Sequence, residues 1–250
     1  MPDSPQRIVI IGATSSIAEH CARLWASGHQ VALTLVGRDA ARIERVAADL
    51  RVRSAGSQVT VRAADLLDPQ AIRLLVDAIV AEGMPDQVLI AHGSLPEQQD
   101  CQRDLAAAAE ALHVNAMSPV LFAEAFAGHM EGSGGVITII GSVAGDRGRR
   151  SNYIYGAAKG LVTRYAQGLQ HRLAGSGSRL RVVLVKPGPT ATPMTAHLPQ
   201  RGLAPVEDVA RQIVDGSNAG KPVVYAPGKW AVIMMVIRHL PAFVFNKMNI

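Results

Sequence analysis

The chain has few of the residues that mark several classes of protein. Its 250 residues include only two cysteines, Cys21 and Cys101, which are too few for a disulfide framework and lack metal-ligand neighbours. Aromatic residues make up 4% of the chain, and the N-terminus has no long apolar segment after a basic start. These absences favour a cytoplasmic protein without a secretory signal or metal site, and they disfavour a β-sandwich.

Basic charge is scattered rather than gathered into a nucleic-acid-binding patch. The formal net charge is +5, and the densest cluster is "DRGRR" at residues 146–150, which has no interleaved aromatic residues. We therefore expect no nucleic-acid partner. The cluster is interpreted as a solvated loop or as a site for an anionic substrate.

Apolar strands alternate with helical patterns along the whole chain. Continuous apolar runs predict strands over residues 7–12, 30–37, 58–66, 87–93, 135–142, 180–188 and 222–227. Helical spacing predicts helices over 17–28, from Asp39, over 68–83, through Asn115 to Met130, and over 153–174 and 206–217. This alternation predicts an α/β fold, a Rossmann-type doubly wound parallel sheet with helices on both faces. No linker or repeat divides the chain, so residues 1–250 are expected to form a single domain.

The ends of the first two predicted strands carry residues suited to a dinucleotide. "GATSSIA" at 12–18 lies between the first strand and the first helix, where helix amides can bind phosphates. Such loops often hold glycine at three positions, but here only Gly12 is a glycine, and the other two positions hold Ser16 and Ala18. The alternative to a phosphate-binding loop is a tight turn with a structural role only. Arg38 matches a ribose 2'-phosphate in charge and geometry, which favours NADP(H) over NAD(H). The alternative is a surface arginine paired with Asp39.

A tyrosine and a lysine are spaced by one helical turn in "IYGAAKG", residues 154–160. Tyr155 and Lys159 would share one face of the helix, where an ammonium favours the phenolate and lowers the tyrosine pKa. An idle surface pair is the alternative. Tyr153 is a poorer candidate because Ala157 follows it by four positions. Ser142 closes the fifth strand, thirteen positions before Tyr155.

Together these motifs resemble the short-chain dehydrogenase/reductase family. They occur in family order over nearly the whole chain as "GATSSIA", "ADL", "AHG", "HVNAMSP", "GSVAGDRGRRSNYIYGAAK" and "KPGPTATPM". The resemblance implies an NADP(H)-dependent oxidoreductase that transfers a hydride between nicotinamide and a carbonyl or secondary alcohol. It also implies a homodimer or homotetramer.

The resemblance implies a role for individual residues. Tyr155 would be the general acid or base, Lys159 would lower its pKa and hold the nicotinamide ribose, and Ser142 would bind the substrate carbonyl. Asn115 would hold a water that relays protons to Lys159. Tyr155 and Lys159 would also bind the cofactor. The other cofactor-binding residues that the resemblance implies are Gly12, Thr14, Ser15, Ser16, Ile17, Arg38, Asp65, Leu66, Gly93, Pro187, Gly188 and Thr192.

The chain departs from the family pattern at two places. The phosphate loop keeps one glycine of three, and "AHG" at 91–93 replaces the usual Asn-Ala-Gly. These changes suggest weakened or unusual cofactor affinity. His92 is expected to be a packed loop residue rather than a catalyst.

The C-terminal segment 228–250 is apolar but interrupted by Arg238, His239 and Pro241, so it is not expected to cross a bilayer. Three interpretations stay open: a core or dimer-interface element, a wall for a long apolar substrate, or peripheral membrane contact through Trp230 and the flanking basic residues. The segment also resembles reductases of the decaprenylphosphoryl keto-pentose type, which suggests a lipid-linked keto-sugar as the substrate. A 3-oxoacyl thioester or a small ketone is an equally compatible substrate.

The alternative to an enzyme is a non-catalytic dinucleotide-binding sensor or a membrane-surface scaffold on the same fold.

Overall fold

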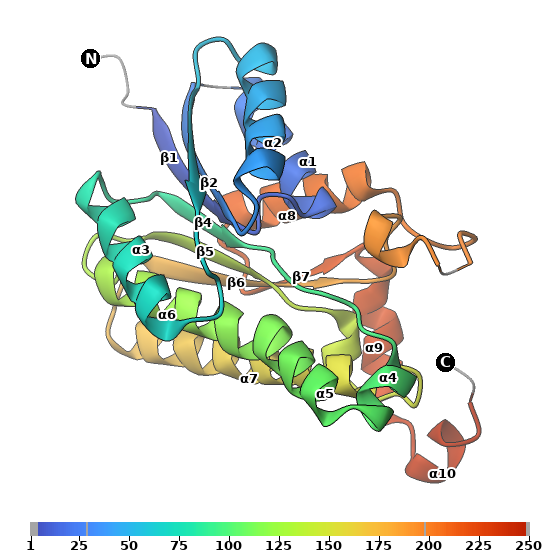
Figure 1. The fold of residues 1–250 in the computed structure, drawn as a ribbon. Coiled ribbons are helices and arrows are strands. Elements are labelled where there is room, and N and C mark those ends of the chain that lie inside the picture. The colour runs from blue at the N-terminus through green and yellow to red at the C-terminus, as the bar shows by residue number, and fades with distance from the viewer. Residues whose placement is uncertain (1–4, 29, 198, 249–250) are drawn as a thin grey trace.

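Seven parallel strands form one sheet in the order β3-β2-β1-β4-β5-β6-β7 (Figure 1). The computed structural model describes residues 5–28, 30–197 and 199–248. The strands are β1 (Gln6–Ile11), β2 (Val31–Gly37), β3 (Gln58–Ala63), β4 (Gln87–Ile90), β5 (Gly135–Ile140), β6 (Leu180–Pro187) and β7 (Val223–Ala226). The strand order reverses between β1 and β4, which is where ligands bind in such sheets. The predicted Rossmann-type fold is confirmed.

Helices cover both faces of the sheet (Figure 1). On one face lie α1 (Ser16–Gly28), α2 (Ala40–Arg53) and α8 (Val206–Asn218), and on the other lie α3 (Pro69–Ala81), α6 (Ser118–Met130) and α7 (Tyr153–Gly175). Each layer has its own apolar core against the sheet. Because both faces are buried, β1 and β5 are mostly apolar, and the last four residues of each are buried.

Two helix starts follow from aspartates in the sequence. The Asp39 carboxylate accepts a hydrogen bond from the Arg42 backbone N–H at 3.0 Å, and the Asp68 carboxylate accepts one from the Ala71 N–H at 2.7 Å. These side chains satisfy amides that have no partner in the first helical turn. The two caps fix where α2 and α3 begin.

Several predicted boundaries differ from the structure. The third strand ends at Ala63 rather than at residue 66, and the fourth ends at Ile90 rather than at residue 93. The residues beyond these ends form the loops at the carboxyl edge of the sheet. The short helix α4 (Gln98–Arg103) was not predicted, since six residues are too few to show helical periodicity.

The helix predicted through Asn115 contains a π turn. It consists of α5 (Leu105–Leu112), the π segment His113–Met117 and α6. Within the described residues, Leu105–Met130 is also the one segment with the length and mean hydropathy, 1.3, of a membrane-spanning helix. Its side chains Phe122, Phe126 and Met130 are completely buried against the sheet, so its apolar composition reflects the protein core.

The C-terminal segment forms α9 (Lys229–His239) and α10 (Ala242–Phe245). Only Met234 of α9 is fully buried, whereas the large apolar side chains Val232, Met235, Val236 and Phe243 are exposed. With eleven residues, α9 is far shorter than the roughly 20 residues that span a bilayer. The three interpretations of this segment stay open, and residues 249–250 lie outside the described part.

Candidate active site

Tyr155 and Lys159 lie on one face of α7, as their spacing predicts. The Lys159 ammonium nitrogen lies 5.8 Å from the centroid of the Tyr155 ring and donates a hydrogen bond to the Ile140 carbonyl at 3.0 Å. The lysine is 3% exposed, and burial lowers its pKa to about 8. Two of its three N–H donors have no protein acceptor among the described residues, so they are free for a ligand.

The environment of Tyr155 differs from the sequence-based expectation. Burial raises the pKa of the phenol, while a hydrogen bond with Ser142 and the charge of Arg149 act in the opposite direction. Lys159 does not contribute to a lower pKa, so the lowering expected from this pair is not found. The phenol is therefore protonated at neutral pH and able to donate a proton.

Ser142 is held beside Tyr155 by the turn that follows β5. Its Oγ accepts a hydrogen bond from the Ala144 backbone N–H at 3.1 Å, so its own O–H remains free to donate. The turn packs tightly on α7, because a Cβ on Gly145 would lie 2.6 Å from the Lys159 backbone carbonyl. Glycine at this position thus allows the serine and the tyrosine to meet.

Asn115 lies completely buried in the π turn between α5 and α6. A π turn leaves a carbonyl without its usual helical partner, and the Asn115 Nδ2 donates to the Ala111 carbonyl at 2.9 Å. Its Oδ1 accepts from the Ser94 N–H at 3.0 Å. A Cβ added to Gly93 would lie 2.8 Å from this Oδ1 and 3.7 Å from the Lys159 Nζ, so the asparagine and the lysine converge on one glycine.

The loop after β1 has the form of a phosphate cradle. Gly12 has a φ of +84°, and a Cβ there would lie 2.5 Å from the His92 backbone nitrogen. Only glycine fits this close approach between the loops after β1 and β4. Helix α1 begins directly after this loop, so the amides of its first turn, with Thr14, Ser15, Ser16 and Ile17, lie at the same edge of the sheet. These residues fit a dinucleotide.

The adenosine end of the predicted cofactor site is built from residues in the loops after β2 and β3. Arg38 is exposed, and among the described residues it makes no ion pair with Asp39, whose side chain caps α2 instead. The Asp65 carboxylate accepts from the Leu67 N–H at 2.8 Å. Leu66 is buried, and its carbonyl accepts a hydrogen bond from the Ser118 hydroxyl.

His92 is a neutral, packed residue, as the sequence suggests. Its Nε2 lies 2.7 Å from the Ser118 Oγ. Because the serine hydroxyl donates to Leu66, the imidazole Nε2 must carry the hydrogen, which makes Nδ1 an acceptor. Burial, with Lys159 and Arg38, lowers the His92 pKa to about 3. Among the described residues the buried Nδ1 atom has no hydrogen-bond partner, and His92 lines the cavity described below.

The far wall of the site combines β6 with the C-terminal helix. Pro187 ends β6 and Gly188 follows it. A Cβ on Gly188 would lie 1.9 Å from the Trp230 Nε1, so α9 packs directly on this glycine. Thr192 starts a short 3-10 turn, and its backbone N–H donates to the Thr195 hydroxyl at 3.1 Å. The C-terminal segment therefore supports one wall of the site.

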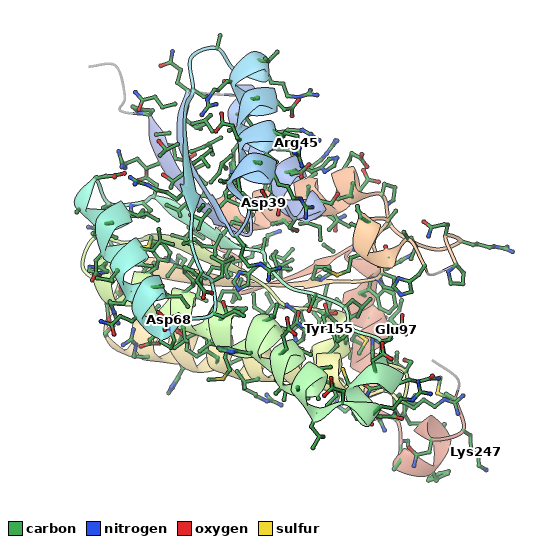
Figure 2. All side chains as sticks on the ribbon, viewed as in Figure 1. Asp39, Arg45, Asp68, Glu97, Tyr155 and Lys247 are labelled. Atoms are coloured by element: carbon green, nitrogen blue, oxygen red, sulfur yellow. The ribbon has the colours of Figure 1, made fainter. Side chains whose placement is uncertain are left out.

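A cavity of about 490 Å³ joins these parts. It lies at the carboxyl edge of the sheet, where Figure 2 labels Tyr155 and Glu97. The predicted site residues that line it are Ser15, Ile17, Gly93, Asn115, Ser142, Tyr155, Lys159, Pro187, Gly188 and Thr192. Those outside its lining are Gly12, Thr14, Ser16, Arg38, Asp65 and Leu66, which belong to the loops after β1, β2 and β3.

Comparison with known proteins identifies the family. A family model described as short chain dehydrogenase matches residues 6–202. The chain belongs to the short-chain dehydrogenase/reductase family. It is 31% identical over 248 residues to an oxidoreductase of Streptomyces coelicolor, covering 98% of this chain and 96% of that one. It is 33% identical over 244 residues to an oxidoreductase of Mycobacterium tuberculosis, covering 96% of each.

A solved structure of a short-chain dehydrogenase from Burkholderia cenocepacia, in complex with NADP, has the same fold. The TM-score is 0.83 with 17% identity, and all of both chains is covered. The chain is thus a short-chain dehydrogenase/reductase enzyme, and its fold matches that of a solved member of the family. The descriptions of these relatives mention no lipid-linked keto-sugar, so that narrower resemblance stays a prediction.

Sequence reasoning did not assign several residues that line the site of this short-chain dehydrogenase. Arg149 and Asn152 enter the cavity from the segment between β5 and α7, while Glu97 and His197 pair across it at 3.6 Å. The only available signal was the "DRGRR" cluster shortly before Tyr155. Nothing in the sequence marks which of its charges faces the cavity.

Proposed function

We propose that this short-chain dehydrogenase/reductase reduces a carbonyl compound with NADPH, and that Tyr155 is the proton donor. The observation that carries the proposal is the convergence of Tyr155, Ser142, Lys159 and Asn115 on one cavity. The cofactor, when bound, supplies the hydride. A non-catalytic sensor would have no use for this arrangement of proton donors.

The reaction needs two hydrogen bonds to the carbonyl oxygen as negative charge develops on it. The protonated Tyr155 phenol provides the proton, and the free O–H of Ser142 provides the second hydrogen bond. The two free N–H donors of Lys159 would hold the ribose hydroxyls of the cofactor. Asn115 lies on the other side of Gly93 and would position a water molecule. That water would deliver a new proton to replace the one that Tyr155 gives up.

The preference for NADP(H) rests on Arg38. This side chain is exposed just beyond β2 and close enough to His92 to lower its pKa, so its charge lies along the predicted adenosine side of the site. A guanidinium pairs well with a phosphate. The structural neighbour in complex with NADP supports the same choice.

The assay follows NADPH or NADH consumption with a panel of aldehydes, ketones, 3-oxoacyl thioesters and lipid-linked keto-sugars. Arg38→Ala should weaken NADPH binding about 10- to 100-fold, because a charge-assisted phosphate contact is lost, and change NADH binding little. Arg45→Ala removes an exposed arginine of α2 and is the matched control (Figure 2). An unchanged cofactor preference in Arg38→Ala would refute the phosphate contact, and no turnover of any carbonyl by the wild type would count against the reductase.

Family membership also leads us to propose a homodimer or homotetramer. The exposed side chains Leu105 and Leu161, on α5 and α7, are candidates for its interface. Size-exclusion chromatography with light scattering measures the assembly.

A further inference from the structure

The basic segment 146–150 places its charged side chains in different environments. The Asp146 carboxylate pairs with the buried ammonium of Lys186 and accepts a hydrogen bond from the Tyr225 hydroxyl at 2.8 Å. Arg147 donates to the carbonyls of Ile237 and Leu240, both at 2.6 Å. These two side chains join the segment to β6, β7 and the C-terminal helices, so their role is structural.

Arg149 has no such partner. Among the residues that the structure describes, its guanidinium makes no ion pair or hydrogen bond, and its Nε is buried without an acceptor. Burial lowers its pKa, because desolvation disfavours the charged guanidinium. A half-buried cation without a counter-ion is unfavourable unless its anion arrives with a ligand.

The other charged groups around the cavity each have a contact with the protein. Lys159 donates to the Ile140 carbonyl, and Glu97 lies 3.6 Å from His197. Asn152, which also lines the cavity, has a buried Oδ1 without a donor, but an amide oxygen carries no charge to balance a guanidinium. Lys159 and Arg149 therefore line the described cavity without a counter-ion. The free N–H groups of Lys159 are those proposed to hold the cofactor ribose, so Arg149 is the cation left for another ligand.

The position of Arg149 separates it from the expected cofactor phosphates. Those phosphates belong at the start of α1, beyond β1, whereas Arg149 follows β5, on the side of β4 away from β1. Arg149 lines the same cavity as Tyr155, and its charge acts to lower the pKa of that phenol. An anion bound to Arg149 would be part of the substrate.

We infer that Arg149 binds an oxyanionic group of the substrate, so that this enzyme acts on aldehydes or ketones that carry a carboxylate, sulfonate or phosphate. The planar fork of a guanidinium matches all three groups. This inference rests on the proposed carbonyl reduction and adds the substrate class to it. Arg149 selects the substrate, whereas Tyr155 and Ser142 act on its carbonyl.

The test compares para-formylbenzoate, para-formylbenzenesulfonate and para-formylphenyl phosphate with the neutral methyl ester of para-formylbenzoate. Arg149→Gln should lower kcat/KM for at least one anionic aldehyde about 10- to 100-fold, mainly by raising KM, and alter that of the ester less than about threefold. Arg149→Lys should restore part of the loss. Arg164→Gln, which removes an exposed arginine of α7 outside the cavity, is the control.

Equal losses for the anionic aldehydes and the ester would overturn the inference, since they would show that Arg149 acts only on the Tyr155 phenol. In that case the pH profile of kcat should shift as well. Circular dichroism and thermal unfolding of each variant verify that it folds, and Arg149→Lys retains the charge should Arg149→Gln fail to fold.

A binding measurement separates this inference from the proposed function. Titration calorimetry follows benzoate, benzenesulfonate and phenyl phosphate binding to the protein saturated with NADP+, in wild type and Arg149→Gln. Anion binding that depends on Arg149, with no aldehyde reduced, would support the anion site and contradict the reductase. Reduction of the aldehydes with neither anion preference nor anion binding would support the reductase and overturn the anion site.

Discussion

Burial controls the chemistry of Tyr155 and Lys159 more than their mutual charge does. Desolvation favours the neutral form of each side chain: the lysine loses its proton more easily, and the tyrosine loses its proton less easily. A protonated phenol is the form that reduction requires, because it must give a proton to the developing alkoxide. The cofactor ribose, lying against Lys159, would complete this arrangement.

The lowered pKa of Lys159 predicts how stability depends on pH. Between the folded value of about 8 and the ordinary value of 10.5, the unfolded chain binds more protons than the folded one, so the free energy of unfolding rises with pH. From pH 7 to pH 9.5, the wild type should gain about 2 kcal/mol relative to Lys159→Met. Urea unfolding of the cofactor-free proteins measures the difference. If that difference does not change with pH, the folded pKa of Lys159 is not lowered.

Residue-scale predictions from sequence succeed where the signal is local. The spacing of Tyr155 and Lys159 requires only a helix, and the helix is present. The pKa of Tyr155 could not be predicted in the same way, because it depends on burial and on Arg149 and Ser142 from other segments. The engagement of Asp146 and Arg147, which leaves Arg149 facing the cavity, likewise depends on the distant residues Lys186 and Ile237.

At the scale of elements, irregular turns position the site. The π turn directs the Asn115 amide toward Gly93, and the short turn after β5 brings Ser142 to Tyr155. A sequence pattern with a period of 3.6 residues cannot reveal a single π turn, so the helix was predicted but this detail was not. The polar Asn115 in mid-helix was the one indication.

The contact between β6 and α9 makes a prediction about Gly188. An alanine there would place its Cβ inside the Trp230 ring, so Gly188→Ala should cost about 1 to 3 kcal/mol of stability by overpacking. In a Trp230→Ala background, Gly188→Ala should lower the free energy of unfolding much less, because the indole ring that its Cβ would overlap is gone. A double-mutant cycle by urea unfolding measures the coupling. Equal costs in both backgrounds would show that α9 does not pack on this glycine.

At the scale of the whole molecule, the alternation of apolar strands and amphipathic helices was sufficient to predict the fold. The internal strands are largely buried on both faces and are therefore mostly apolar, which is a strong signal. The C-terminal helices were harder to predict, because α9 is apolar on its exposed side as well as on its packed side. Periodicity cannot separate a packed face from a free one when both are apolar.

The account as a whole depends on Tyr155 as the proton donor at the carboxyl edge of the sheet. The most direct test is the turnover of Tyr155→Phe with a carbonyl that the wild type reduces. Tyr153→Phe, an exposed tyrosine outside the cavity lining, is the matched control. We expect Tyr155→Phe to bind NADPH normally and to lose about 10²- to 10⁴-fold in kcat, while Tyr153→Phe stays near wild type. A kcat of Tyr155→Phe within about threefold of wild type would contradict the account.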